Sequence, residues 1–132
     1  AGPAAGAAAG AAGEADGASF APASEEEAIL LLQMAIKCSD VGHLTLDWAS
    51  HVRWVSLLEE ELFAQGDQER AAGLCPISRL MDREQPGATE TQVGFLEYVL
   101  PLFRALARGL PGAAPMLRGA EANAQRWRRA DA

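Results

Sequence analysis

The sequence has few basic residues, and its first 36 positions have none. It contains 11 Lys and Arg residues against 18 Asp and Glu residues, which gives a net charge of −7. Lys37 is the first cation, and this argues against a secretory signal and against an Arg-rich transit peptide. The later cations form no basic stripe except "RWRR" at 126–129, so the composition disfavours binding to nucleic acid.

Long apolar runs are absent, and cysteines and histidines are scarce. No apolar stretch approaches the roughly eighteen residues of a membrane-spanning helix, so no membrane segment is expected. Cys38 and Cys75 fit neither a disulfide framework nor a zinc cluster. His43 and His51 do not stand at a metal-binding helical spacing, so the chain alone does not encode a complete zinc or two-metal centre. We therefore expect a reducing compartment and an intracellular, cytoplasmic location.

The first segment of the chain also has little that could form a core. Residues 1–23, "AGPAAGAAAGAAGEADGASFAPA", are almost wholly Ala and Gly with one aromatic residue, Phe20. Such a segment cannot bury enough apolar surface to offset the entropy lost on ordering. We predict a flexible, low-complexity tail over 1–23 and a folded part over 24–132. Because the chain begins without Met, we also expect it to be an excerpt of a longer protein.

A helix is predicted directly after this segment. Ser24 and Glu27 form a capping box ahead of a run that is apolar on nearly every side from Ile29 to Cys38. A helix that is apolar all round is typical of a buried position. The pattern therefore predicts a core helix of something larger, with a stop near Gly42.

Three further helices are predicted downstream. Asp47 can cap a second helix, and Gly66 is expected to end it. A third helix should run from about 91 to 108 with an interruption at Pro101, and a fourth from about 113 to 129. The apolar stripe of the second helix consists of Trp48, Val52, Val55, Leu58 and Leu62. Nothing alternates with the strand period, so the expected fold class is all-α.

From residue types alone, few side chains could carry chemistry. Asp40 lies at a helix end before a glycine-containing loop with His43, where a carboxylate can face a metal ion. The competing interpretation is that Asp40 only ends the helix by bonding local backbone. By pattern, Gln92 would be a polar helix start and Phe95 a core ring, while the acids at 59–61 would form a solvated face. The pattern alone thus predicts a helical domain without an assigned reaction.

Five motifs follow one another in an order that resembles a known family. They are "MAIKCSDVGH", "RW" at 53–54, "EEELFAQGDQER", "GLCPISRLMDR" and "TQVGFLEYV", with "NAQRW" near the end. Over about residues 28–129 they are similar to the C-terminal part of the catalytic domain of eukaryotic class I 3′,5′-cyclic nucleotide phosphodiesterases. The resemblance implies the C-terminal helical part of a compact multi-helix catalytic domain.

The resemblance implies a metal-binding role for Asp40. This residue matches the family's metal-ligand aspartate, which helps to hold zinc beside a second ion, usually magnesium, with manganese as an alternative. Such a pair lowers the pKa of bound water and places a hydroxide in line with the cyclic phosphorus. The family's general-acid histidine and its other metal ligands lie upstream of the matched part, so we expect this chain alone to be inactive.

The resemblance also implies a purine pocket. Gln92 matches the family's purine glutamine, whose amide offers an acceptor and donors to the edge of the base. Phe95 matches the ring that stacks on the base, and Leu58 matches the aliphatic residue on its other side. The other matched pocket positions are His43, Trp54 and Leu80. Because an amide that rotates can present either group first, Gln92 is compatible with both cAMP and cGMP.

Several positions depart from the family pattern. Arg79 and Leu44 stand where the family has proline, and Met81 replaces its usual cysteine. One residue is added near Cys75, and one is missing before Pro101. These changes fall on the pocket floor and on the packing of the last helices.

The sequence thus predicts a fragment of an enzyme that hydrolyses cAMP or cGMP to the 5′-monophosphate in cyclic nucleotide signalling. A small-molecule cyclic nucleotide is the expected partner, and the oligomeric state is left open. The alternative is a truncated, non-catalytic helical relative that acts as a nucleotide-binding or protein-interaction module.

Overall fold

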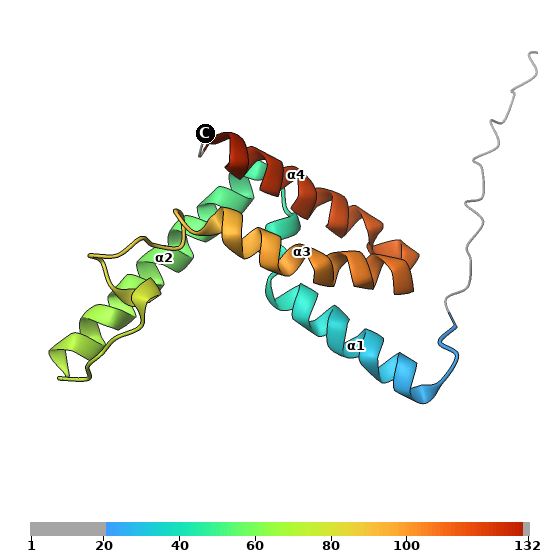
Figure 1. The fold of residues 1–132 in the computed structure, drawn as a ribbon, viewed down its shortest axis with the longest axis horizontal. Coiled ribbons are helices and arrows are strands. Elements are labelled where there is room, and N and C mark those ends of the chain that lie inside the picture. Colours follow the sequence, from blue (N-terminus) through green and yellow to red (C-terminus); the bar gives the residue numbers. More distant parts are fainter. Residues whose placement is uncertain (1–20, 131–132) are drawn as a thin grey trace, which may run out of the picture.

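The computed structural model of the protein describes residues 21–130, and within them the fold is all-α, as predicted (Figure 1). The elements are α1 (Glu25–Asp40), η1 (Gly42–Thr45), α2 (Trp48–Ala71), η2 (Arg79–Met81), α3 (Gln92–Gly109), η3 (Pro111–Ala113) and α4 (Ala114–Ala130), where η marks a short 3-10 helix. Most of the tail predicted for 1–23 lies outside the described residues.

Three of the four described α-helices pack together, and α2 extends away from them. α3 and α4 lie side by side in opposite directions, joined by η3, and α1 packs along α3 (Figure 1). α2 contacts η1 and η2. Two exposed ion pairs cross from α3 to α4, Arg104 to Glu121 and Glu97 to Arg128, each with an N–O distance of 3.2 Å. Exposed pairs contribute at most about 1 kcal/mol each, so apolar contacts dominate this packing.

The core lies where α3 faces α1 and α4. α3 buries one apolar face, made of Leu96, Val99, Leu100, Phe103 and Leu106. This face meets Cys38 of α1, Leu44 of η1 and the small residues Ala120 and Ala124 of α4. Phe103 is 1% exposed and is the largest of the fully buried side chains in the described residues.

Side-chain caps start α1 and α2 where the sequence predicts them. Ser24 Oγ accepts the N–H of Glu27 at 3.1 Å, and Asp47 Oδ1 accepts the N–H of Ser50 at 3.1 Å. Hydrogen bonds with Ser50 lower the pKa of the Asp47 carboxyl below its ordinary value. Each cap satisfies an N–H that has no partner within the first turn of its helix.

The prediction that Gly66 ends the second helix is wrong. α2 continues to Ala71, and Gly66 is buried. A Cβ at this position would collide with the backbone carbonyl of Met81. The glycine therefore allows η2 to approach α2 more closely than any side chain permits, and it marks a packing contact rather than a helix end.

Pro101 does not interrupt α3, which is a second correction. The helix runs from Gln92 to Gly109 with Pro101 inside it, on the exposed side. Proline lacks the N–H that would bond to the carbonyl of Glu97. Because Glu97 is exposed as well, solvent can reach this part of the helix and replace the missing bond.

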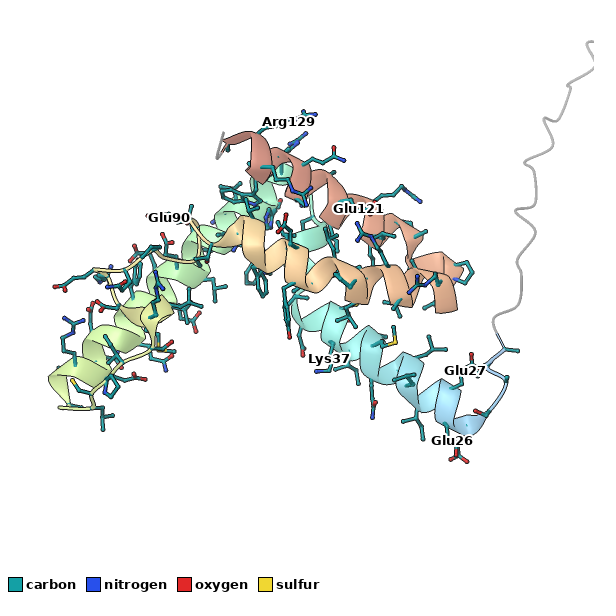
Figure 2. All side chains as sticks on the ribbon, viewed as in Figure 1. Glu26, Glu27, Lys37, Glu90, Glu121 and Arg129 are labelled. Atoms are coloured by element: carbon teal, nitrogen blue, oxygen red, sulfur yellow. The ribbon has the colours of Figure 1, made fainter. Side chains whose placement is uncertain are left out.

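α1 is not buried by the described residues, although its composition predicts a core helix. Cys38 is its one buried residue within the described range. Four of its large apolar side chains are 47–64% exposed: Ile29, Leu30, Leu32 and Ile36. Figure 2 shows α1 side chains between Glu26 and Lys37 that point away from α3. In the described part of the chain, α1 included, no helix is both long and apolar enough to cross a membrane.

Candidate functional site

The candidate site begins with a buried amide at the start of α3. Gln92 is 3% exposed, and its Nε2 donates to the carbonyl of Ala88 at 2.9 Å. Its Oε1 is the one buried side-chain nitrogen or oxygen atom of the described residues that lacks a hydrogen-bond partner. An unsatisfied buried acceptor costs about 1–3 kcal/mol. This oxygen is therefore a candidate contact for a ligand donor.

A cavity of about 400 Å³ lies against this amide. Apolar side chains from α2, η2 and α3 make most of its walls: Leu58, Leu62, Leu80 and Phe95, together with Ala88, Thr91, Gln92 and Gly94. Four of the predicted purine-pocket residues thus line one cavity. An apolar slot with a single amide in its wall suits a planar heteroaromatic group.

A second cavity, of about 240 Å³, contains the remaining predicted residues. Asp40 from the end of α1, His43 from η1 and Trp54 from α2 line it, and Leu58 and Phe95 are shared with the first cavity. The rings of His43 and Trp54 stack with centroids 6.3 Å apart. Asp40 and Gln92 therefore line different cavities that have two walls in common.

Phe95 also lines a third cavity, of about 590 Å³. This cavity lies between α1 and α3, and Lys37, Asp40 and Tyr98 are among its walls. Phe95 is a core ring by helical pattern alone, yet it is 36% exposed, and Trp54 is 56% exposed. The interpretation of Phe95 as a core ring is wrong for the described part of the chain.

His51, which the sequence did not single out as a site residue, holds η1 against α2. It is fully buried, and its Nε2 accepts the indole N–H of Trp127 at 2.8 Å, so the ring proton is on Nδ1. Nδ1 lies 3.2 Å from the carbonyl of His43 and 3.4 Å from its Nδ1. Burial lowers the pKa of both histidines, and at His51 the neighbouring His43 lowers the pKa further.

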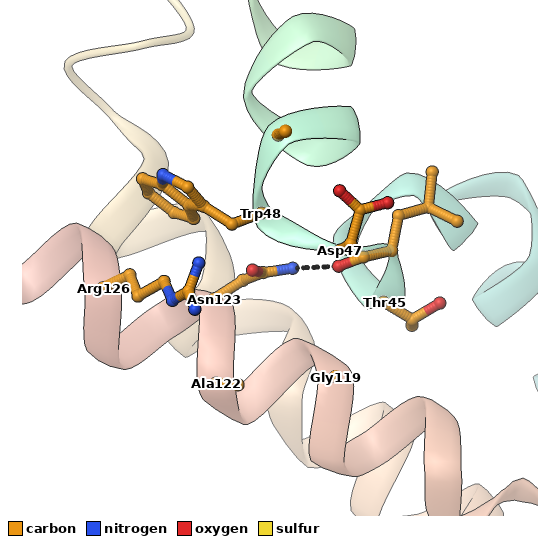
Figure 3. Close-up of a pocket in the computed structure, with 9 residues that line it drawn as sticks. Thr45, Asp47, Trp48, Gly119, Ala122, Asn123 and Arg126 are labelled. Atoms are coloured by element: carbon orange, nitrogen blue, oxygen red, sulfur yellow. Dashed lines mark hydrogen bonds between the residues drawn. The ribbon is translucent and has the colours of Figure 1, made fainter.

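Asn123 holds the same loop from α4. Its Nδ2 donates to the carbonyls of Leu44 at 2.8 Å and Leu46 at 2.9 Å. Asn123 also lines a separate cavity of about 530 Å³, and Figure 3 shows it there with Trp48 and Arg126. The segment "NAQRW" therefore positions the loop that carries His43, and its residues lie outside the first two cavities. Only the three-dimensional contact assigns this role, because Asn123 is 77 and 79 residues from its two acceptors.

The described residues do not form a metal site by themselves. No group of three or more His, Cys, Asp or Glu side chains among them is placed to hold a metal ion. Asp40, His43 and Glu61 line the second cavity without forming such a group. A pair of ions would need ligands from outside the described residues.

Comparison with known proteins gives the class. The model of the 3′,5′-cyclic nucleotide phosphodiesterase family matches residues 10–120. The chain is 38% identical over 76 residues to the dual specificity calcium/calmodulin-dependent 3′,5′-cyclic nucleotide phosphodiesterase 1B of Bos taurus, a match that covers 57% of this chain and 14% of that protein. It is 34% identical over 94 residues to the high affinity cGMP-specific 3′,5′-cyclic phosphodiesterase 9A of Mus musculus, covering 70% and 17%. It is 27% identical over 93 residues to the 3′,5′-cyclic-AMP phosphodiesterase 4 of Dictyostelium discoideum, covering 70% and 9%.

The chain belongs to the 3′,5′-cyclic nucleotide phosphodiesterase family, since the family model covers well over half of it. This confirms the resemblance drawn from the five motifs. The chain spans less than a fifth of the length of these relatives. The family is generally metal-dependent.

Proposed function

We propose that this chain is the base-binding, C-terminal part of an enzyme that hydrolyses cAMP or cGMP to the 5′-monophosphate in cyclic nucleotide signalling. One observation carries the proposal: the buried Gln92 amide has an unpartnered oxygen, and Leu58 and Phe95 line the cavity beside it. Family membership supplies the substrate class. The names of the relatives include a dual-specificity, a cGMP-specific and a cyclic-AMP enzyme, so they leave the choice of nucleotide open.

A purine would bind between Leu58 and Phe95 with its polar edge toward Gln92. The Phe95 ring offers a stacking surface, and Leu58 supplies an apolar surface for the other face of the base. Gln92 Oε1 would accept an N–H of the base. If the amide rotated, Oε1 would face the carbonyl of Ala88. Because two acceptors cannot form a hydrogen bond, the orientation that leaves Oε1 free is favoured.

The cyclic phosphate end of the nucleotide would face the second cavity. We assign Asp40 as one ligand of a divalent pair, with zinc beside magnesium or manganese, and His43, Trp54 and Leu80 as pocket walls. The described residues do not supply the other ligands, so hydrolysis is proposed for the longer protein and not for this chain alone. The free cysteines, Cys38 and Cys75, favour an intracellular, cytoplasmic location.

The test starts from the endogenous protein, isolated with an antibody against residues 45–65. Its mass and peptide map define the full chain, which is then produced and assayed for release of 5′-monophosphate from cAMP and cGMP. We expect Asp40→Asn to abolish turnover, and Gln92→Ala to raise KM by about tenfold because a buried base contact is lost. Glu60→Gln, an exposed change on α2, is the matched control.

Three outcomes would contradict parts of the proposal. Full activity of Asp40→Asn overturns the metal assignment. Saturable binding of cyclic nucleotide without turnover in the full protein favours the non-catalytic, nucleotide-binding alternative. A protein that neither binds nor hydrolyses cyclic nucleotide overturns the proposed function.

A further inference from the structure

The first acid of the run at 59–61 is not on a solvated face, contrary to the sequence pattern. Glu59 is half-buried, and its Oε2 accepts the backbone N–H of Thr89 at 2.8 Å, across 30 residues of sequence. The two other acids are exposed, and Glu60 lies 3.5 Å from Arg83 in an exposed ion pair. Glu59 alone of the three has a hydrogen bond to residues 87–91, the turn that leads into α3, in the described structure.

That segment is a tightly packed turn. Gly87 and Ala88 are buried, and a Cβ on Gly87 would collide with the carboxylate of Glu59. Thr91 Oγ1 closes the turn by donating to the carbonyls of Gly87 at 3.0 Å and Ala88 at 3.3 Å. The same Ala88 carbonyl accepts the bond from Gln92 Nε2. The position of this carbonyl therefore decides which way the amide of Gln92 faces.

We propose that Glu59 is a positioning residue for the purine site. By holding the N–H of Thr89, it fixes the turn whose Ala88 carbonyl orients the Gln92 amide, and it thereby keeps Oε1 directed at the ligand. Glu59 lines neither of the first two cavities, so it acts through the turn and not by touching the base. A carboxylate suits this role because a charged acceptor forms a stronger hydrogen bond to a backbone N–H than a neutral one. This inference rests on the proposed function, since it concerns the same amide.

The test is a double-mutant cycle in the full-length protein that the peptide map defines, with a fluorescent cyclic nucleotide as the probe. Glu59→Ala should weaken binding by about tenfold, because the amide loses its fixed orientation. In the Gln92→Ala background the same change should weaken binding by less than about twofold, because there is no amide left to orient. Glu59→Gln keeps a neutral acceptor and should restore most of the affinity. Glu60→Ala is the matched control and should leave binding unchanged.

A purely structural role for Glu59 gives a different result. Equal losses in both backgrounds, or a loss in Glu59→Gln as large as in Glu59→Ala, would overturn the inference. The side-chain amide signals of Gln92 in nitrogen-15 NMR spectra provide an independent measurement, since Glu59→Ala should shift them and speed their hydrogen exchange. If the unmodified full-length protein binds no cyclic nucleotide, the base-binding role fails, and unchanged Gln92 signals in Glu59→Ala would then overturn the positioning role separately.

Discussion

α1 and α3 are both rich in apolar residues, yet the fold treats them differently. α3 turns most of its apolar residues to one face and buries them against α1 and α4, while Phe95 and Tyr98 stay exposed. α1 is apolar on nearly every side and has a packing partner on one side only within the described residues, so Ile29, Leu32 and Ile36 stay exposed. The residue pattern predicts that each segment is helical, whereas the burial of its apolar side chains depends on which elements pack against it.

The candidate site divides along the same line. Gln92 and Phe95 belong to α3, and the buried amide of Gln92 is anchored to the turn that precedes it. Asp40 is the last residue of α1 and is exposed, and it belongs to no group of three or more possible metal ligands in the described structure. Within residues 21–130, the part of the site that would bind a base is formed, whereas a complete metal site is not.

The largest expected effect tests the burial of α3 against the exposure of α1. Phe103→Ala should lower the free energy of unfolding by about 3–5 kcal/mol, because it removes a ring from the core. Leu32→Ala removes a side chain that is 64% exposed, and it should change stability by less than about 0.5 kcal/mol. Urea unfolding followed by circular dichroism measures both. Similar losses for the two variants would mean that α1 is covered, and the comparison would be wrong.

A smaller effect tests whether α2 is as closely packed against η2 at Gly66 as α3 is packed in the core. Gly66→Ala should destabilise by about 1–3 kcal/mol, because its new methyl group meets the backbone of η2, which cannot move as a side chain can. Gly112→Ala is the control, since nothing lies within 4 Å of a Cβ there. Thermal unfolding compares the two. A stabilised Gly66→Ala variant would show that η2 does not rest on α2.

The smallest expected effect is a loss of stability at acidic pH. It should weaken the contact between α2 and α4 and leave α1 unaffected. Folding lowers the pKa of His51 and His43 below 6.5, so below about pH 6.5 the unfolded chain binds more protons than the folded one. This contribution to stability is present above that pH and is lost as the pH falls. Hydrogen exchange at about pH 7.5 and about pH 5.5 should show faster opening of the Trp127 region of α4 at the lower pH. His51→Gln removes one titrating group and should reduce this difference, and an equal acid response in that variant would contradict the assignment to His51.

Local chemistry could be predicted from the sequence, and tertiary contacts could not. The caps at Ser24 and Asp47 involve N–H groups three residues away, so the pattern specifies both partners. By type, Gly66 and Pro101 are predicted to break their helices. Gly66 instead allows η2 to approach α2 closely, and Pro101 is tolerated because its side of α3 is exposed. The structural role of such a residue depends on its neighbours in the fold, which sequence spacing does not identify.

The candidate site shows the same limit. Helical spacing alone places Gln92 and Phe95 on one face of a helix, and the family motifs add Leu58 and Leu80 from two other segments. In the structure these residues line one cavity. Neither source indicates the bond from the Thr89 N–H to Glu59 or that from Trp127 to His51. Both bonds join residues that are far apart in the sequence, and they support the site from outside the cavities.

The shared position of Phe95 has a consequence for how this protein can evolve. One ring borders the space beside Gln92 and both spaces beside Asp40, so a substitution there alters all three together. Selection for a different base would then also disturb the end of the site that holds the carboxylate. Of the cavities described above, Leu62 and Leu80 border that beside Gln92 alone. Substitutions at these two leucines could therefore change the preferred nucleotide without altering the cavities beside Asp40.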